Sequence, residues 1–169
     1  AILAHESVPR EQALALAAEM LRLVGVDPAR MRDYPHQFSG GMRQRVVIAL
    51  ALAAQPKLII ADEPTTALDV SIQAQVLQLL RQLCREQRTA MLLVTHDMGV
   101  IAETADRVAV MYAGRIVEIG AVEDVIRSPV HPYTRGLMGA IPTLDESLGP
   151  LAQIDGAMPR LNARPDGCA

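Results

Sequence analysis

The fold is decided by residues 57–64, which read Lys-Leu-Ile-Ile-Ala-Asp-Glu-Pro. An apolar run begins here after Pro56 and stops at two carboxylates and a second proline. A short apolar run between such boundaries predicts a β-strand over 57–61 that is buried on both faces. Residues 90–94 (AMLLV) have the same character and predict a second buried strand.

The segment between the two predicted strands has the pattern of a helix over residues 70–87. Apolar side chains recur there at helical spacing, at Ile72, Val76, Leu79, Leu80 and Leu83. Two strands joined by a helical crossover form a βαβ unit, so we expect the strands to be parallel. Both strands end in polar residues, Asp62-Glu63 and Thr95-His96-Asp97. Because ligands bind at the carboxyl ends of such strands, these two polar groups are expected to lie side by side at one site.

The remaining elements flank this unit in the sequence. Before it, amphipathic spacing predicts a helix over 10–24, ended by Gly25, and another over 39–54. The apolar face of the first contains Leu14, Met20, Leu21 and Val24. After the unit we expect a helix over 98–105, a hairpin of strands 107–112 and 115–119, and short helices over 121–127 and 132–140. From residue 142 onward Pro, Gly and Asp recur without periodicity, which predicts an extended tail.

Composition narrows the class of protein. With 169 residues, 50% of them hydrophobic and 21% charged, the chain is an ordinary globular protein of one or two domains. Its two cysteines, Cys84 and Cys168, cannot form a disulfide framework or a four-ligand zinc site, which favours a reducing compartment. A net charge of -3 and 2% aromatic residues argue against a protein that coats nucleic acid.

Residues 38–45 (FSGGMRQR) open the second predicted helix with two adjacent glycines. Glycine in a helix costs about 1 kcal/mol relative to alanine, so two in the first turn need a reason. Behind an N-capping Ser39, Gly40 and Gly41 leave the amides of the helix N-terminus unobstructed, and that end of a helix attracts phosphate. The alternative is a helix start whose glycines serve no ligand.

Three side chains at the ends of the strands are placed for phosphate chemistry. Asp62 is suited to holding Mg²⁺, and Glu63 to orienting or deprotonating an attacking water. His96 is suited to contacting a γ-phosphate, whereas Asp69 could simply cap the helix that follows it. Taken singly, an acidic pair and a lone histidine at strand ends are also common structural features.

The order and spacing of these clusters resemble the ATP-binding cassette (ABC) ATPases. Ser39-Gly40-Gly41 resembles the signature motif of that family, 58–63 the Walker B strand with its catalytic glutamate, 66–69 the D-loop, and His96 the switch histidine. The resemblance covers about residues 30–120. It implies an α/β fold of the P-loop NTPase type, in which a parallel sheet carries a helical subdomain. Residues 1–55 would form that subdomain, 56–120 the C-terminal part of the ATPase core, and 121–169 a C-terminal extension.

The extension and residue 42 narrow the resemblance to one branch. Residues 128–134 (SPVHPYT) and the Pro-rich tail, with 156–159 and 167–168, resemble the oligopeptide, dipeptide and nickel importers. Many ABC ATPases have Gln after the signature glycines, whereas this chain has Met42, as that branch often does. One side-chain contact to the nucleotide is therefore expected to be lost or replaced.

The resemblance also implies roles for the site residues, with ATP and Mg²⁺ as cofactors. Asp62 would hold Mg²⁺ through water, and Glu63 would position the attacking water as general base. His96 would steady the γ-phosphate, and Asp69 would link two sites across an interface.

Its implied partners are a second cassette and membrane subunits. Two cassettes, identical or homologous, would close head to tail over two ATP molecules, with Ser39, Gly40, Gly41 and Met42 acting in trans. Hydrolysis would drive membrane-spanning permease subunits, which an extracytoplasmic binding protein supplies with peptides. The chain would lie at the cytoplasmic face of the inner membrane and bind no nucleic acid.

One expected motif is absent from the sequence. It contains no P-loop (G-x-x-x-x-G-K-[ST]), and its one lysine, Lys57, follows Pro56. We therefore expect a fragment that begins inside the helical subdomain and lacks the Walker A half. We expect no iron–sulfur cluster, which needs about four thiolates. Three other hypotheses stay open: an ABC-type ATPase of DNA repair, one of translation, and a non-catalytic remnant.

The absence of the motif generates the first prediction. Because P-loop amides and the P-loop lysine hold the β- and γ-phosphates, we expect the purified 169-residue chain to show no measurable ATPase and at most weak nucleotide binding. Phosphate release measures the ATPase activity, and the fluorescence of a labelled nucleotide measures the binding. Robust hydrolysis that depends on Mg²⁺ would contradict this expectation.

Overall fold

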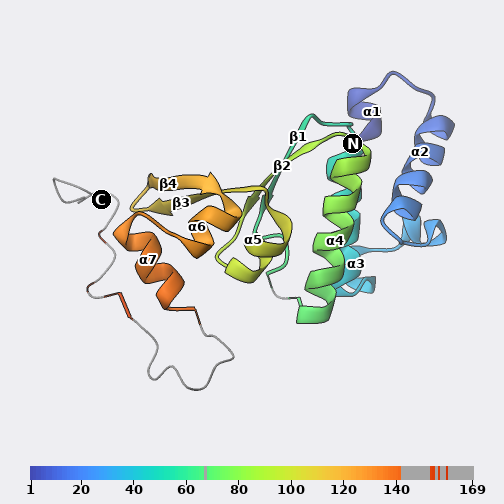
Figure 1. Ribbon diagram of the computed structural model, residues 1–169. Helices are drawn as coiled ribbons and strands as arrows, with labels where there is room; N and C mark the ends of the chain where they lie inside the picture. Colours follow the sequence, from blue (N-terminus) through green and yellow to red (C-terminus); the bar gives the residue numbers. More distant parts are fainter. Residues whose placement is uncertain (67, 142–152, 155, 157–158, 160–169) are drawn as a thin grey trace. The chain divides into compact units, whose positions relative to one another are not determined.

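The computed structural model describes residues 1–66, 68–141, 153–154, 156 and 159 (Figure 1). It divides into two compact units, residues 1–96 and 97–169, which are described here one at a time. Most of the predicted tail after residue 142, together with Cys168, lies outside the described residues. In the part that is described, no helix is both long and apolar enough to cross a membrane.

The first unit contains the predicted βαβ arrangement and the helices before it. Its elements are α1 (Ile2–His5), α2 (Arg10–Leu23), the 3-10 helices η1 (Pro28–Arg32) and η2 (Pro35–Gln37), α3 (Gly40–Leu52), β1 (Leu58–Asp62), α4 (Val70–Glu86) and β2 (Ala90–Val94). Each predicted helix and strand of this unit is confirmed to within two residues at either end. The chain leaves α2 through Gly25, whose φ of 71° suits a residue without a side chain.

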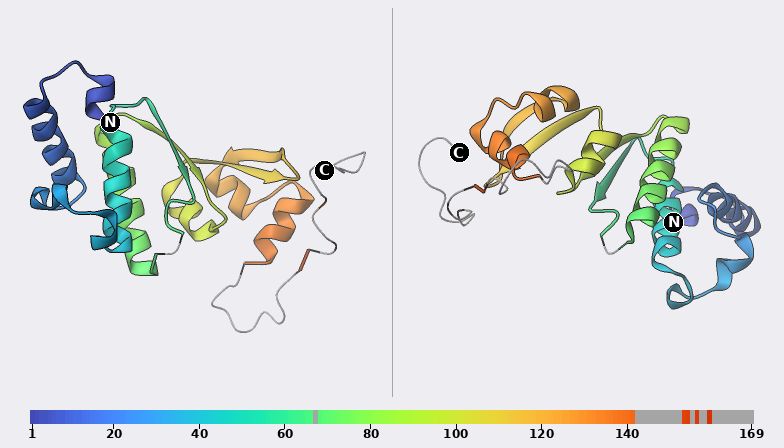
Figure 2. Two further views of the ribbon diagram at one scale, coloured as in Figure 1. Left: turned by 180° about the vertical axis from the view of Figure 1, so that it is seen from behind. Right: turned by 60° about the horizontal axis from the view of Figure 1, so that its bottom comes forward.

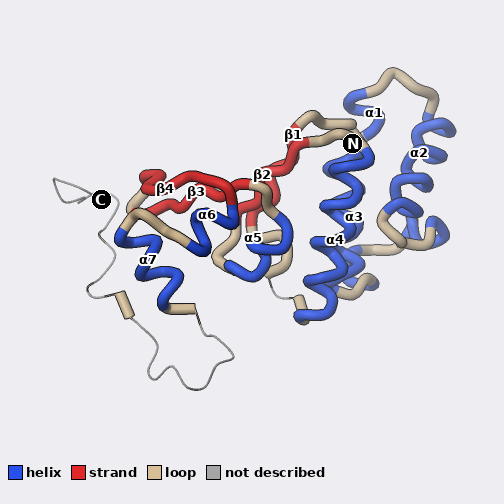
Figure 3. Tube along the Cα trace, in the orientation of Figure 1, coloured by secondary structure: helices blue, strands red, loops and turns tan. Residues whose placement is uncertain are grey.

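The strands β1 and β2 pair in parallel, as predicted. Their register runs from Leu58 opposite Ala90 to Asp62 opposite Val94, and α4 is the crossover between them (Figure 3). Both strands therefore end at the same edge of the sheet. Thr89, which is buried, ties the start of β2 to the start of β1 because its hydroxyl donates to the carbonyl of Pro56 at 2.9 Å.

The prediction that both strands are buried on both faces is wrong. In β1 only Ile59 and Ala61 are buried, because α3 and α4 pack over the face of the sheet to which these side chains point (Figure 2). Ile60 on the other face is 64% exposed, and Leu92 of β2 is 52% exposed. No described element of this unit covers that second face, so the apolar run reflects a layer that the unit does not contain.

The core of the first unit lies between the sheet and its helices. Its buried residues come from the end of α2, from α3, from β1 and from one face of α4: Val24, Val26, Ile48, Ala49, Leu52, Ile59, Ala61, Val76, Leu80, Leu83 and Cys84. The predicted apolar face of α4 is confirmed. In the first predicted helix, Met20, Leu21 and Val24 pack in or against this core as predicted, whereas Leu14 is half-exposed and Ala13 is buried.

The second unit is built around the predicted hairpin. It contains α5 (Met98–Thr104), β3 (Arg107–Tyr112), β4 (Arg115–Ala121), α6 (Val122–Arg127) and α7 (Pro132–Gly139). The turn residues Ala113 and Gly114 both have positive φ, 48° and 76°, which is the pattern of a type I′ hairpin turn. Val108 and Val110 of β3 form a small core with Val122 and Val125 of α6.

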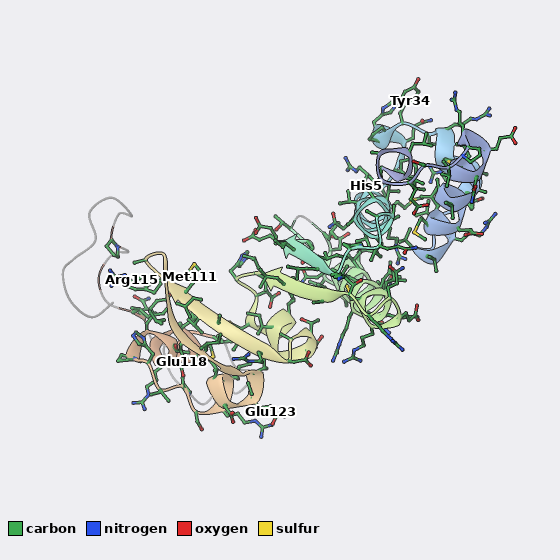
Figure 4. The ribbon with its side chains drawn as sticks, turned by 90° about the horizontal axis from the view of Figure 1, so that it is seen from above. His5, Tyr34, Met111, Arg115, Glu118 and Glu123 are labelled. Atoms are coloured by element: carbon green, nitrogen blue, oxygen red, sulfur yellow. The ribbon has the colours of Figure 1, made fainter. Side chains whose placement is uncertain are left out.

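One carboxylate anchors the last described helix to this hairpin. Glu118 of β4 accepts the backbone N–H groups of Val130, at 2.8 Å, and of His131, at 3.0 Å. His131 is the N-cap of α7, and its Nδ1 accepts the N–H of Tyr133 at 3.1 Å. In Figure 4 Glu118 lies on the side of the hairpin that carries the helices, whereas Met111 projects from the hairpin into solvent. The SPVHPYT segment is thereby fixed as a structured part of this unit.

The two glycines of α3 have a packing role in addition to any ligand role. A Cβ added to Gly41 would lie 2.6 Å from Cγ2 of Ile72 in α4, a distance that real structures do not tolerate. A Cβ added to Gly40 would lie 3.3 Å from Cδ2 of Leu68, which a flexible side chain can accommodate. The first turn of α3 can approach α4 closely only because residue 41 has no side chain.

This difference between the glycines gives a stability test. We expect Gly41→Ala to lower the free energy of unfolding by about 1–2 kcal/mol, because overpacking exceeds the gain in helix propensity. The matched control Gly40→Ala should be neutral or stabilising by up to about 1 kcal/mol. Urea denaturation followed by circular dichroism measures both. Adding Ile72→Ala to Gly41→Ala should remove the clash. Equal stability of Gly41→Ala and Gly40→Ala would contradict the packing role of Gly41.

Candidate active site

The site begins where β1 ends, at a residue with unusual backbone geometry. Glu63 has a φ of 43°, which is uncommon for a residue with a side chain and costs on the order of 1–3 kcal/mol. Its N–H donates to the carbonyl of Val94 at 2.8 Å, so it still extends the pairing of β1 with β2. Its carbonyl accepts the N–H of Thr66 at 3.2 Å, which closes the turn that follows. The backbone is thus held in the left-handed conformation from both sides.

Both carboxylate oxygens of Glu63 have hydrogen-bond partners. Oε1 lies 2.9 Å from Nδ1 of His96, and Oε2 accepts the hydroxyl of Thr66 at 2.9 Å. Because an ionised carboxylate can only accept, Nδ1 of His96 carries the proton and Nε2 remains available toward solvent. Glu63, Thr66 and His96, called the carboxylate triad below, confirm that the polar groups after the two strands lie side by side.

The triad keeps its carboxylate ionised. The hydrogen bond from His96 and, second, that from Thr66 lower the pKa of Glu63 below its ordinary value of 4.5, and this outweighs a small opposing effect of burial. The side chains are accessible, since His96 is 83% exposed and Glu63 45%. At neutral pH Glu63 is therefore a negatively charged acceptor with fixed orientation.

Asp62 differs from its neighbour. It is the last residue of β1 and is exposed, and its side chain forms no hydrogen bond or ion pair with another described residue. No group of three or more His, Cys, Asp or Glu in the described ranges could hold a metal by itself. A single free carboxylate suits Mg²⁺, because this ion keeps most of its waters and binds through one or two carboxylates together with phosphate oxygens.

The predicted phosphate-binding turn lies at the start of α3. The hydroxyl of Ser39 accepts the N–H of Met42 at 3.3 Å, and its carbonyl accepts that of Arg43 at 2.9 Å. The N–H groups of Gly40 and Gly41 precede these bonds, so they have no acceptor within the helix. Ser39, Gly40, Gly41 and Met42, called the signature turn below, thus present two donors at a positively polarised helix end.

The side chains of Met42 and Asp69 do not make the contacts that their positions at helix starts suggest. Met42 directs its side chain inward, where it packs against the core and its Sδ accepts Nη1 of Arg30 at 3.2 Å. Asp69 stands at the N-cap of α4, but its side chain makes no capping hydrogen bond. The alternative that Asp69 is present only as a cap is therefore not supported, and its role between two sites stays a prediction.

Two functional neighbours escaped the sequence reasoning. The sequence analysis predicts no contact between Thr66 and Glu63, although a hydroxyl three residues after a carboxylate in a turn is a recognisable signal. Arg30 contacts residues on both sides of Ser39, but its place in a polar, turn-rich segment gave no signal in the sequence. The structure joins the triad residues to one another, and it places Gly40 and Gly41 against Leu68 and Ile72.

Two segments of the chain match known protein families. Residues 3–66 match the family described as "ABC transporter", and residues 117–169 match "Oligopeptide/dipeptide transporter, C-terminal region". A dimeric post-hydrolysis structure of the ATP-binding cassette MJ0796, bound to ADP and Pi, superposes with a TM-score of 0.60 and 32% identity, covering 69% of this chain and 50% of that one. The chain belongs to the ABC transporter family.

Within that family it carries the C-terminal region of the oligopeptide and dipeptide transporter branch. It is 52% identical over 170 residues to the dipeptide transport ATP-binding protein DppD of Bacillus subtilis (strain 168), covering 99% of this chain and 51% of that protein. It is 54% identical over 168 residues to the oligopeptide transport ATP-binding protein OppD of the same organism, covering 98% and 47%. The chain thus spans about half the length of these relatives.

The triad makes a titration prediction. Because the hydrogen bond from His96 is the largest cause that lowers the pKa of Glu63, we expect His96→Ala to raise that pKa toward 4.5, and Thr66→Val to raise it less. Carbon-13 NMR of the glutamate carboxyl groups measures the shift. His36→Ala, which alters an exposed histidine stacked on Tyr34, is the control and should leave Glu63 unchanged. An unaltered pKa in His96→Ala would show that the hydrogen bond does not form in solution.

Proposed function

We propose that the chain supplies the signature turn, the Walker B carboxylates and the switch histidine of a cassette that hydrolyses ATP to power peptide import. The observation that carries this proposal is the carboxylate triad: an ionised, accessible carboxylate, oriented by His96 and Thr66, at the end of a parallel strand. A general base needs this combination of charge, access and fixed direction. The family match and the names of the relatives support the cassette and its cargo.

In this proposal Glu63 accepts a proton from the water that attacks the γ-phosphate. Its two hydrogen bonds leave lone pairs on each oxygen free for that water, while preventing rotation of the carboxylate. His96, whose Nδ1 proton is held by Glu63, would steady the γ-phosphate from its exposed Nε2, taking up a proton from solvent as it does so. Asp62 would hold Mg²⁺ through water, and this ion supplies neutralisation of phosphate charge when bound.

The signature turn acts on the nucleotide of a second cassette. The N–H groups of Gly40 and Gly41, which have no acceptor within the helix, and the hydroxyl of Ser39 would donate to a γ-phosphate, favoured by the positive end of α3. Met42 would contribute through its backbone and packing, since its side chain points inward. Asp69 would link the two sites. The dimeric form of the solved MJ0796 cassette supports the pairing of two cassettes.

The proposed partners and location follow from the branch. The named relatives are dipeptide and oligopeptide transport proteins, so the cargo would be short peptides, delivered by an extracytoplasmic binding protein to permease subunits. The chain would act at the cytoplasmic face of the inner membrane as a peripheral subunit, without nucleic acid. None of the relatives named above supports the hypotheses of DNA repair or translation.

The catalytic assignment can be tested in a chimera. Residues 1–169 replace the matching half of Bacillus subtilis DppD, to which they are 52% identical, and ATP hydrolysis is measured. We expect Glu63→Gln to lower kcat by about 10²- to 10⁴-fold, because the amide cannot accept the proton, while ATP binding persists.

The matched control is Glu86→Gln at the end of α4, where the side chain accepts a hydrogen bond from Gln82. It should leave kcat unchanged. Turnover near that of the parent chimera in Glu63→Gln would contradict the role of Glu63.

A further inference from the structure

We propose that Arg30 is a positioning residue that holds the signature turn in its phosphate-binding geometry. The inference rests on the proposed function of that turn, and it concerns a residue outside the signature, the Walker B strand and the D-loop. Arg30 lies in η1, nine residues before Ser39 in the chain.

Every nitrogen of the Arg30 guanidinium has a partner. Nε donates to Oδ2 of Asp33 at 2.7 Å, Nη1 to Sδ of Met42 at 3.2 Å, and Nη2 to the carbonyl of Gln37 at 2.9 Å. The pair with Asp33 is about one-third exposed on either side, so solvent screens it only partly. Asp33, three residues after Arg30, orients the guanidinium through Nε, and the other two nitrogens bond to Met42 and Gln37 on either side of Ser39.

These contacts lie on both sides of Ser39. The carbonyl of Gln37 and the sulfur of Met42 bracket it along the chain, and the ring of Phe38, the residue directly before it, lies 4.7 Å from Cζ of Arg30. A guanidinium over an aromatic face is attracted by the ring as well as packed against it. One side chain therefore fixes the residues that enter and leave the N-cap of α3.

Lysine could not make this arrangement. The guanidinium presents its donors in a planar fork and can bond three acceptors while stacking on a ring, whereas an ammonium is a compact point charge. The inward direction of Met42 is part of the same arrangement, because its sulfur is the acceptor for Nη1. Met42 thus has a defined function here even though its side chain faces away from solvent.

The rest of α3 has a separate anchor. Arg45, one turn further along, donates from Nη1 to the carbonyl of Val24 at 2.9 Å. Loss of Arg30 should therefore loosen the first turn of α3 without releasing the helix. A turn that is ordered before the nucleotide arrives avoids the cost of ordering it during closure of the two cassettes.

The first experiment uses the 169-residue chain and requires no catalysis. Hydrogen exchange followed by mass spectrometry compares segment 38–45 with α4 in wild type, Arg30→Met, Arg30→Lys and the control Arg32→Met, whose exposed side chain lies in the same 3-10 helix. We expect exchange in 38–45 to be about tenfold faster or more in Arg30→Met, because charge-assisted hydrogen bonds are lost. The exchange of α4 should not change. Arg30→Lys should be intermediate and Arg32→Met like wild type.

Unchanged exchange of 38–45 in Arg30→Met would overturn the proposal. If Arg30→Met speeds exchange in both 38–45 and α4, the result for Arg30→Lys is used instead. Faster exchange confined to 38–45 in Arg30→Lys supports the positioning role, and faster exchange in both segments overturns it.

The second experiment links the position to catalysis in the DppD chimera. We expect Arg30→Met to lower kcat about tenfold with KM for ATP within about twofold, partial recovery in Arg30→Lys, and no effect of Arg32→Met. Unchanged kcat in a variant whose segment 38–45 exchanges faster would overturn the catalytic part of the inference. A chimera that hydrolyses no ATP with the wild-type chain would refute the proposed function, and the exchange experiment would still decide whether Arg30 holds the turn.

Discussion

The parallel pairing of β1 with β2 is the constraint on which the active site depends. Parallel strands end at one edge of their sheet, and the N–H of Glu63 extends the pairing by one residue, to the carbonyl of Val94 at 2.8 Å. The chain therefore leaves both strands at the same place, and Glu63 and His96, 33 residues apart in sequence, come within hydrogen-bond distance. The length of α4 makes this possible, because a parallel connection must return the chain to the starting end of the sheet.

The start of α3 shows how one local sequence can satisfy two demands. Gly40 and Gly41 place no side chain over the amides at the start of the helix, and the absent side chain of Gly41 allows Ile72 to approach closely. A turn with so little side chain has few contacts of its own, so its order has to come from neighbours. Ser39 supplies one hydrogen bond, and the guanidinium of Arg30 supplies contacts to the residues on either side.

The sequence pattern predicted α2 to α7, the strands and the parallel order, because these elements have local apolar patterns, but it did not predict the short helices α1, η1 and η2. It also predicted that the polar groups containing Glu63 and His96 would lie side by side, since that follows from topology. It could not predict the contacts of Arg30 with Met42 and Gln37, or those of Thr66 with Glu63, because side-chain geometry in turns leaves no periodic trace. The prediction that β1 is buried on both faces was wrong for a physical reason. An apolar sequence shows that a strand is suited to burial, whereas its exposure depends on which elements pack against it.

The uncovered face of the β1–β2 sheet has a consequence for the colloidal behaviour of the chain. Leu58, Ile60, Leu92 and Val94 are about half-exposed on it and form a contiguous row of branched apolar side chains. Such a patch attracts any apolar surface, including the same patch on another copy. Sulfate and phosphate strengthen apolar burial, so these salts would promote self-association of the chain at concentrations where chloride would not. The residues that give the strand its strong sequence signal thus also set the salt and concentration range in which the chain stays dispersed.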